Sequence, residues 1–299
     1  MKLLPPAETY IKAWVTHAPL PNPSAIPTVQ GNLNEIYSTH DSMIHQATSS
    51  PYEGYYKGLA GWKMGAVGIL PNVPCLSGPL FNRFVQHECS DSVLDVTSAY
   101  GGTTTHTLEG EVGFVMKEDV NPTSGGDLSI EDVWDCVDFI LPCIEVCGNR
   151  FSEALLVSGK VPIADKLADG LMCAGVICGL PVSKTRVESN FGGNYEKVDE
   201  RLKSIVGSLL VNGKLINEGT GVNCPERGPL ASLAWLANHL VKRGTCLKKG
   251  EIIISGAICK TSAFPVGAAR PDEVLVDFGP FLGKVGVKIV RGKVGASKL

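Results

Sequence analysis

The segment Glu109-Gly-Glu-Val-Gly-Phe-Val-Met116 combines two acidic residues with an apolar run. The β-branched content of Gly110–Met116 and the turn residues around it predict a strand. Side chains two positions apart on a strand point to the same face, so we expect Glu109 and Glu111 to project together. A cation would relieve the repulsion between them, and oxygen ligands favour magnesium or manganese. The spacing alone favours the alternative, two solvated glutamates on the exposed face of an amphipathic strand.

Further strands are predicted from the same kind of pattern. The candidates are Ile205–Val211, Glu251–Ser255, Glu273–Phe278 and Gly286–Val290. The segment Val211-Asn-Gly-Lys-Leu215 predicts a hairpin, because Asn-Gly tolerates the positive φ angles of a type I′ turn.

Helices are expected in four places, from their apolar spacing and their end signals. Three of them are Ala7–His17, Leu33–Gln46 and Leu230–Val241. The fourth begins after the cap residue Ser129, carries Val133, Trp134, Val137 and Ile140 on its apolar face, and ends before Pro142. The polar stretch Lys184–Arg201 is predicted to be a long surface loop. Helices and strands do not alternate regularly, which disfavours a doubly wound or barrel fold.

The composition is that of a globular protein of one or two domains. The 299 residues include 44% hydrophobic and 19% charged residues, which argues against general disorder. A formal charge of −3 gives no basic excess for a nucleic-acid backbone, so we expect no nucleic-acid partner. No apolar run reaches the ~18 residues that a membrane span needs, and no secretory signal is evident. We therefore expect a soluble, cytoplasmic protein.

The ten cysteines are predicted to be packing residues in a reducing compartment, because none forms a Cys-x-x-Cys pair and the chain has no export signal. Cys143 and Cys147 lie on either side of Glu145 and, on a strand, share its face. We expect replacement of either cysteine by alanine to leave magnesium binding intact.

Glu145 and Lys63 are candidate functional residues because of their apolar surroundings. Glu145 lies within Ile140-Leu-Pro-Cys-Ile-Glu-Val-Cys147, and a charge in such a run is rarely buried unless it is paired or bound to a metal. The alternative is a strand residue whose outward face is wet. Lys63 lies in Gly61-Trp-Lys-Met-Gly65, where a desolvated lysine could serve in acid/base chemistry. The alternative is a surface lysine in a turn.

Weaker signals come from Asp165 and Lys166, within Val161-Pro-Ile-Ala-Asp-Lys-Leu-Ala-Asp-Gly170. Arg150 and Asp169 are candidates by position only.

An ordered series of motifs resembles the 2-oxopent-4-enoate hydratase and 4-oxalocrotonate decarboxylase family of the fumarylacetoacetate hydrolase superfamily. The series consists of Gly61-Trp-Lys-Met-Gly65, Gly78-Pro-Leu-Phe81, Glu109-Gly-Glu-Val-Gly-Phe-Val115, Cys143-Ile-Glu-Val-Cys-Gly-Asn-Arg-Phe151, Ile163-Ala-Asp165, Gly219-Thr-Gly221, Leu233-Ala-Trp-Leu-Ala-Asn238, Leu247–Gly256 and Phe281-Leu-Gly-Lys-Val285. It covers about residues 33–291. The sequence departs from the family where Gly148-Asn-Arg150 replaces Asp-Ser-Arg and where Lys166 replaces Asn.

The resemblance implies a role for each matched residue. Glu109, Glu111 and Glu145 would hold one divalent ion, Mg²⁺ or Mn²⁺, with Lys63 and Asp165 as catalytic residues. Substrate contacts would come from Arg150, Leu80, Ser255 and Lys166.

The fold that the resemblance implies is α+β, a mixed β-roll or β-sandwich with flanking helices. A small N-terminal α/β region, residues 1–75, would precede a catalytic domain, residues 76–299. Members of this family usually form homo-oligomers.

The reaction that the resemblance implies is hydration of a 2-oxo-alkenoate to a 4-hydroxy-2-oxo acid. A 2-oxo acid can chelate the ion, which stabilises the enolate that forms, while Lys63 moves the proton. Decarboxylation of a 4-oxalocrotonate-type acid uses the same enolate, and hydrolysis of an acylpyruvate would need an added general base. A repurposed or catalytically idle member of the family is a further alternative.

Overall fold

The larger sheet is centred on the long antiparallel pair β5 (Thr105–Met116) and β6 (Val137–Cys147). In the computed structural model its strand order is β2-β1-β11-β5-β6-β7-β3. The other strands of this path are β1 (Leu59–Gly65), β2 (Leu76–Phe81), β3 (Val85–His87), β7 (Cys173–Cys178) and β11 (Ile252–Ile254). Three short strands extend it, β8 (Val182–Ser183) on β6 and both β12 (Cys259–Lys260) and β13 (Phe264–Pro265) on β5.

The smaller sheet has the order β10-β9-β14-β15-β4 and packs against the larger one. Its strands are β4 (Val93–Asp95), β9 (Val206–Val211), β10 (Lys214–Thr220), β14 (Asp272–Asp277) and β15 (Lys284–Val290). The predicted hairpin is confirmed, since Val211 pairs with Lys214 around Asn212 and Gly213, whose φ angles are 50° and 76°.

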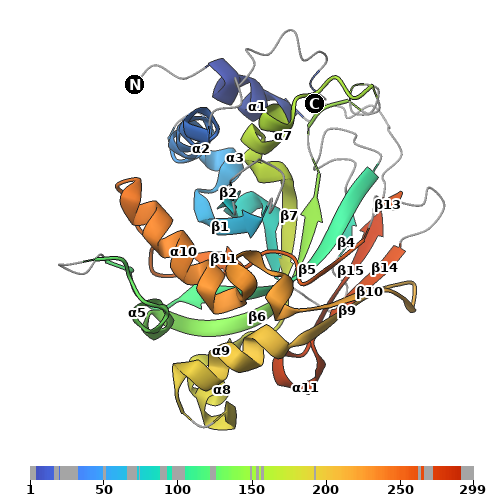
Figure 1. Ribbon diagram of the computed structural model, residues 1–299. Helices are drawn as coiled ribbons and strands as arrows, with labels where there is room; N and C mark the ends of the chain where they lie inside the picture. The colour runs from blue at the N-terminus through green and yellow to red at the C-terminus, as the bar shows by residue number, and fades with distance from the viewer. Residues whose placement is uncertain are drawn as a thin grey trace.

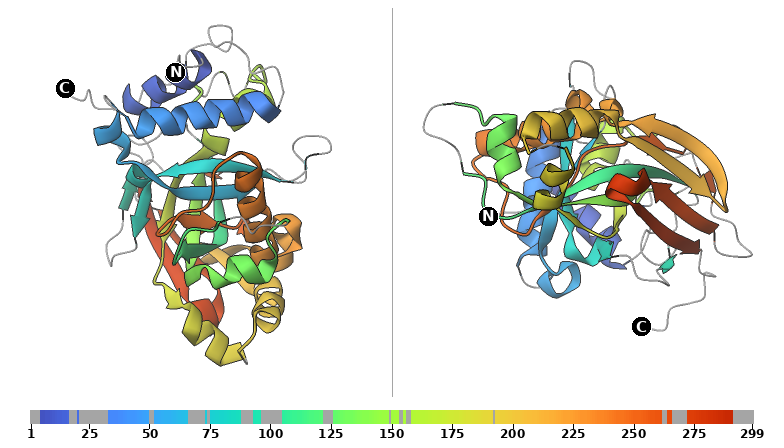
Figure 2. Two further views of the ribbon diagram at one scale, coloured as in Figure 1. Left: turned by 90° about the vertical axis from the view of Figure 1, so that its left-hand side faces the viewer. Right: turned by 90° about the horizontal axis from the view of Figure 1, so that it is seen from below.

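One group of helices lies together at one end of the sheets, and the others cover one side and the far end (Figures 1 and 2). The first group is α1 (Pro5–Thr16), α2 (Leu33–Ala47), α3 (Glu53–Tyr56) and α7 (Ile163–Ala168). The remaining helices are α5 (Ile130–Asp135), α8 (Lys184–Phe191), α9 (Tyr195–Ser204), α10 (Pro229–Lys242) and α11 (Gly279–Leu282). The structure describes residues 5–16, 20, 33–49, 52–65, 73, 75–87, 93–95, 105–121, 126–148, 150–152, 155, 158–191, 193–261, 264–265 and 272–290.

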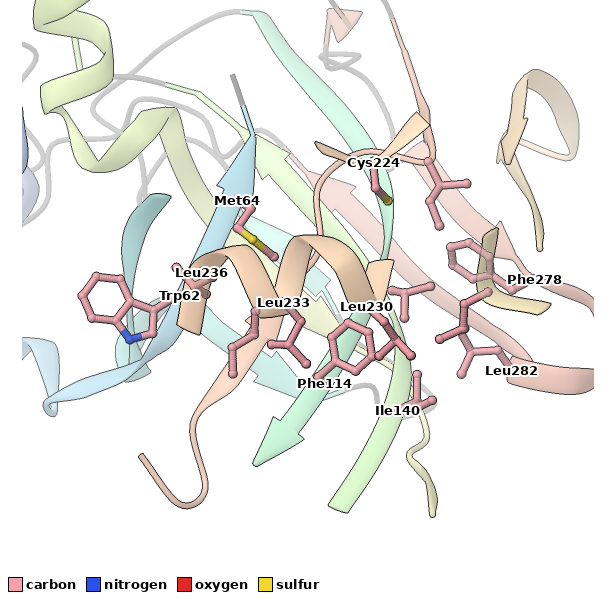
Figure 3. Packing of buried hydrophobic residues seen from close by; sticks show 14 of the residues in the cluster. Trp62, Met64, Phe114, Ile140, Cys224, Leu230, Leu233, Leu236, Phe278 and Leu282 are labelled. Atoms are coloured by element: carbon pink, nitrogen blue, oxygen red, sulfur yellow. The ribbon is translucent and has the colours of Figure 1, made fainter. Parts of the chain in front are cut away.

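The two faces of the central strands have different roles. Leu108, Val112 and Phe114 of β5 alternate with its glutamates and join the main core. Helix α10 covers this core, and its Leu230, Leu233 and Leu236 lie above β5 and β6 (Figure 3). The opposite face therefore carries the odd-numbered residues of β5 and, from Leu141 onward, of β6, which include all three predicted metal ligands.

Two sequence expectations are wrong. The stretch predicted to be a loop over 184–201 forms the helices α8 and α9, because Val187, Val198 and Leu202 are buried on one side of otherwise polar segments. The helix expected after Ser129 ends at Asp135. Its predicted continuation belongs to β6, where tertiary pairing with β5 outweighs the helical spacing of Val137 and Ile140.

Most other elements confirm their predictions. The helices α1, α2 and α10 and the strands β5, β9, β11, β14 and β15 lie where the patterns placed them. Strand β1, from the region expected to be a separate N-terminal unit, pairs with β11 of the larger sheet. The boundary at residue 75 stays a prediction. Among the described residues, no helix has the length and apolarity that crossing a membrane requires.

The cysteines of the described part of the chain form no disulfide, as predicted. All nine cysteines in this part of the chain are free thiols.

A buried histidine makes the fold sensitive to acid. His40 of α2 is fully buried, and its Nε2 donates a hydrogen bond to the Leu167 carbonyl of α7 at 3.0 Å. Burial lowers the pKa of His40 to about 4. The unfolded chain takes up this proton near pH 6.5, so the contribution to stability is present above pH 6.5 and is lost as the pH falls toward 4.

We expect the free energy of unfolding to fall by about 2 kcal/mol between pH 7 and pH 5 through His40 alone. Urea unfolding of His40→Gln at both pH values should show a correspondingly smaller fall than the wild type. His45→Gln, an exposed histidine of the same helix, is the control and should behave like the wild type. Equal pH dependence in all three proteins would contradict the assignment.

Candidate metal centre

The pairing of β5 with β6 brings two of the predicted ligands directly opposite each other. Glu109 is in register with Glu145, and Glu111 with Cys143. Directly opposed side chains of an antiparallel pair have Cβ atoms about 5 Å apart. Glu109, Glu145 and Cys147 each offer a ligand atom, and these atoms lie within 4.8 Å of one another. The structure thus brings Glu109 and Glu145 together, as the family resemblance implies, and adds the thiol of Cys147.

Lys63 reaches this cluster from strand β1. Its ammonium donates to Oε1 of Glu145 and, at 3.2 Å, to the backbone carbonyl of Leu171. The neighbouring Trp62 and Met64 point to the opposite face and join the main core, which fixes the direction of Lys63. The lysine is only 4% exposed, so the alternative of a surface lysine in a turn is wrong.

Glu111 is fully buried on the same face, one alternation along β5. The backbone N–H of Gly256, which follows β11, donates to its Oε2 at 2.7 Å. The alternative of two solvated glutamates is wrong for Glu111, although Glu109 is only partly buried.

The electrostatics of the cluster show strong like-charge repulsion. Burial first, and then the charge of Glu145, raises the pKa of Glu109, and burial with Glu145 and Glu109 raises that of Glu111 well above its usual range. Burial opposes the charge of Lys63, but the neighbouring Glu145 carboxylate raises its pKa well above the ordinary value. Three carboxylates and one ammonium would carry a net charge of −2 when all are ionised.

The donor atoms left over fit a divalent cation. Glu145 Oε2 and Glu111 Oε1 are buried and accept no hydrogen bond within the described part of the chain. A buried anionic oxygen without a partner is costly, and a doubly charged cation would compensate the net charge of −2. Carboxylate oxygens are the ligands that Mg²⁺ and Mn²⁺ prefer. The carboxylate chemistry therefore fits the ion that the family resemblance implies. The structure brings Glu109 and Glu145 into one compact group of ligand atoms with Cys147, whereas Glu111 lies outside that group.

A left-handed turn supplies the second partner of Lys63. Gly170, Leu171 and Met172 have φ angles of 58°, 55° and 61°, and this conformation costs a residue with a side chain of order 1 kcal/mol or more. The turn packs against β2, where a Cβ on Gly78 would lie 2.6 Å from the Leu171 Cβ. The sequence reasoning missed the Leu171 carbonyl, because a backbone group has no residue-type signal.

Arg150 is buried beside the turn. Its guanidinium pairs with Asp169 at 3.4 Å and lies 3.7 Å above the Trp14 ring, whose Nε1 donates to Asp169 at 2.7 Å. Its Nε and Nη2 atoms have no hydrogen-bond partner in the described structure. A buried cation with unused donors can bind a carboxylate, which is the role expected of Arg150.

The other predicted site residues lie around this centre at different depths. Leu80 of β2 belongs to the apolar cluster that includes Cys143 and Cys173 on the metal-binding face. Ser255 is fully buried and directly precedes Gly256, the donor to Glu111.

Asp165 is buried in α7, where its backbone carbonyl accepts a hydrogen bond from the Tyr10 hydroxyl at 2.9 Å. Lys166, the next residue, is partly buried. Their catalytic and substrate-binding roles stay predictions.

Comparison with known proteins gives relatives that are hydratases or decarboxylases. 2-Hydroxyhexa-2,4-dienoate hydratase of Comamonas testosteroni is 27% identical over 150 residues, which cover 50% of this chain and 49% of that protein. 4-Oxalocrotonate decarboxylase of Pseudomonas putida is 30% identical over 183 residues, 61% of this chain and 60% of that protein. The chain thus spans about half the length of the hydratase that it matches. No family model matches it.

Solved structures establish the fold. 4-Oxalocrotonate decarboxylase from Pseudomonas putida G7, complexed with magnesium and adipate, has a TM-score of 0.71 at 22% identity and covers 95% of both chains. Fumarylpyruvate hydrolase from Pseudomonas aeruginosa, in complex with Mn²⁺ and pyruvate, has a TM-score of 0.52 at 15% identity, covering 77% of this chain and 89% of that one.

These likenesses show that the chain has the α+β fold of these two enzymes, which confirms the predicted fold class. Within that class, the predicted resemblance to the 2-keto-4-pentenoate hydratases and 4-oxalocrotonate decarboxylases is also confirmed.

Glu109→Gln tests the metal centre without removing the partner of Lys63. We expect Mg²⁺ and Mn²⁺ affinity, measured by titration calorimetry, to fall about 10-fold or more, because a ligand is lost. The melting temperature of the metal-free protein should stay equal or rise, since one of the repelling charges is gone. Cys143→Ala, on the same strand face, is the control and should bind both ions like the wild type. Unchanged affinity in Glu109→Gln would disprove the centre.

Proposed function

We propose that the chain is a divalent-metal-dependent lyase that adds water to a 2-hydroxy-dienoate or 2-oxo-alkenoate and yields a 4-hydroxy-2-oxo acid. The observation that carries the proposal is the set of carboxylates on one strand face, Glu111 and Glu145 buried and Glu109 partly buried, with the Lys63 ammonium paired to Glu145. Sequence similarity to a 2-hydroxyhexa-2,4-dienoate hydratase and to 2-keto-4-pentenoate hydratases supports this reaction.

Magnesium or manganese is the proposed cofactor. The three glutamates would hold it, and the neighbouring decarboxylase structure, which contains magnesium, supports this choice. A bound divalent ion supplies a Lewis acid that stabilises negative charge on the 2-oxo oxygen of a chelating substrate.

Lys63 is the proposed acid/base group. Its ammonium is fixed by Glu145 and by the Leu171 carbonyl, so its position is set before a substrate binds. It would deliver a proton to, or remove one from, the substrate carbon next to the oxo group. Asp165 is proposed as a second catalytic residue, on the strength of its motif alone.

Substrate binding is proposed to combine one cation with an apolar wall. Arg150 has two unused donors for a carboxylate, and Leu80 belongs to the apolar layer that would exclude water from the reacting carbons. Ser255 and Lys166 are proposed as further substrate contacts.

Decarboxylation of a 4-oxalocrotonate-type acid is the second candidate. The similarity in fold covers 95% of both chains in the comparison with 4-oxalocrotonate decarboxylase, and a decarboxylase is 30% identical in sequence. The same enolate would accept the electrons that departing carbon dioxide releases, so the described centre serves both reactions.

A homo-oligomer, a cytoplasmic location and a place in aromatic catabolism are proposed on the family resemblance alone. Light scattering on the purified protein would test the assembly.

Turnover of two substrates decides between the reactions. We expect 2-hydroxypenta-2,4-dienoate to be hydrated, activity to disappear with EDTA, and Mg²⁺ or Mn²⁺ to restore it. Release of carbon dioxide from 4-oxalocrotonate without hydration of the dienoate would establish the second candidate instead. Turnover that EDTA leaves unchanged would refute the metal-dependent mechanism.

Lys63→Met tests the acid/base role separately from metal binding. We expect kcat to fall by about 10²- to 10⁴-fold, the usual contribution of a positioned acid or base, while Mn²⁺ affinity is retained. Lys242→Met is the control and should keep full activity, because Lys242 is an exposed lysine at the end of α10 and pairs with Asp127. A Lys63→Met enzyme with wild-type kcat would show that another group moves the proton.

A further inference from the structure

We propose that Cys147 is a thiolate ligand of the metal centre, so that the centre binds borderline ions such as Zn²⁺ and Co²⁺ through sulfur as well as oxygen. The thiol lies within 4.8 Å of the ligand oxygens of Glu109 and Glu145. The proposal rests on the metal centre of the proposed function and extends it to the choice of metal.

Strand geometry places this thiol on the ligand face. Cys147 lies two residues after Glu145 on β6 and pairs with Thr107, two residues before Glu109 on β5. Residues two apart share a face, so the cysteine completes a compact group of donors from two adjacent strands.

An unused buried oxygen points independently to a ligand here. Glu145 is 0% exposed, and its Oε2 has no hydrogen-bond partner among the described residues. The Lys63 ammonium satisfies only Oε1. Glu145, a member of the group with Glu109 and Cys147, therefore has one buried anionic oxygen without a hydrogen-bond partner among the described residues.

The neighbouring cysteines differ from Cys147. Cys143 is fully buried in an apolar cluster and faces Glu111 across the strands. Cys173 lies opposite Cys147 on β7 and belongs to the apolar cluster. Burial first, and then the nearby Glu145 carboxylate, raises the pKa of its thiol. Of the cysteines that the structure describes, only Cys147 joins two carboxylates in a three-residue group. Cys173 is thus a matched control, being a nearby thiol on the adjacent strand.

Two overlapping donor sets follow from this arrangement. Glu109 and Glu145 belong to both. Cys147 lies in one compact group with them, whereas Glu111 lies further along the same strand pair, outside that group. The all-oxygen set suits Mg²⁺, whereas a thiolate favours Zn²⁺ and Co²⁺ and adds little for a hard ion. Binding through sulfur replaces the S–H bond of Cys147 by a metal–sulfur bond and releases one proton, without a change in oxidation state.

Cobalt titration of the metal-free full-length protein tests the proposal. With Co²⁺, the wild type should show a near-ultraviolet thiolate-to-cobalt charge-transfer absorption at one equivalent. Cys147→Ser should lose this absorption and bind Co²⁺ and Zn²⁺ about 10-fold or more weakly, with Mg²⁺ affinity kept within about 2-fold. Cys173→Ser should keep the absorption. Circular dichroism checks that both variants fold.

The outcomes separate this proposal from the proposed function. Stoichiometric Co²⁺ binding without the charge-transfer absorption, and with equal affinity in Cys147→Ser, would overturn the thiolate ligand and leave the all-oxygen centre standing. Loss of the absorption in Cys173→Ser but not in Cys147→Ser would also overturn it. A wild type that binds neither Co²⁺ nor Mg²⁺ would remove the metal centre itself.

Discussion

Repulsion among buried carboxylates is the constraint on which the site depends. Glu111 and Glu145 are fully buried beside Glu109, and one ammonium, that of Lys63, faces them. Such an arrangement is unfavourable by itself, so the apolar packing on the other face of the strands must stabilise it. That face carries Leu108, Val112 and Phe114, which pack beneath α10 and the smaller sheet. Folding therefore positions a negative site that a divalent cation can complete.

The N-terminal helix is coupled to this site through a short chain of contacts. Trp14 of α1 donates to Asp169, which also holds Arg150 and directly precedes the left-handed turn 170–172. The turn presents the Leu171 carbonyl to Lys63. The unfavourable backbone of Leu171 is kept because neighbours on both sides fix it. Residues distant in sequence from the motifs thus set the position of the proposed acid/base group.

The sequence predicted which side chains share a strand face, but it did not predict the backbone conformation of the site. The two-residue spacing predicted that Glu109 and Glu111 share a strand face, and the apolar surroundings of Glu145 indicated a buried charge, because both features depend on local pattern. Only the family resemblance joined the three carboxylates in one site. The helix expected through Ile140 was wrong, since Val133, Trp134, Val137 and Ile140 also suit a helix and only pairing with β5 excludes it. The role of Leu171 depends on a φ angle of 55°, which its residue type does not indicate.

The choice between hydration and decarboxylation must lie outside the carboxylate cluster, because both reactions use the same stabilised enolate. A substrate with a second carboxylate needs a second cation in this buried setting. Lys63 is already neutralised by Glu145, whereas Arg150 has one carboxylate partner, Asp169, and two unused donors. Under the proposed function, the distance between the metal centre and Arg150 would limit the length of the acid, and the apolar layer around Leu80 would limit its polarity. Specificity would therefore depend on these two features and on the helical end of the molecule that holds Arg150 in place.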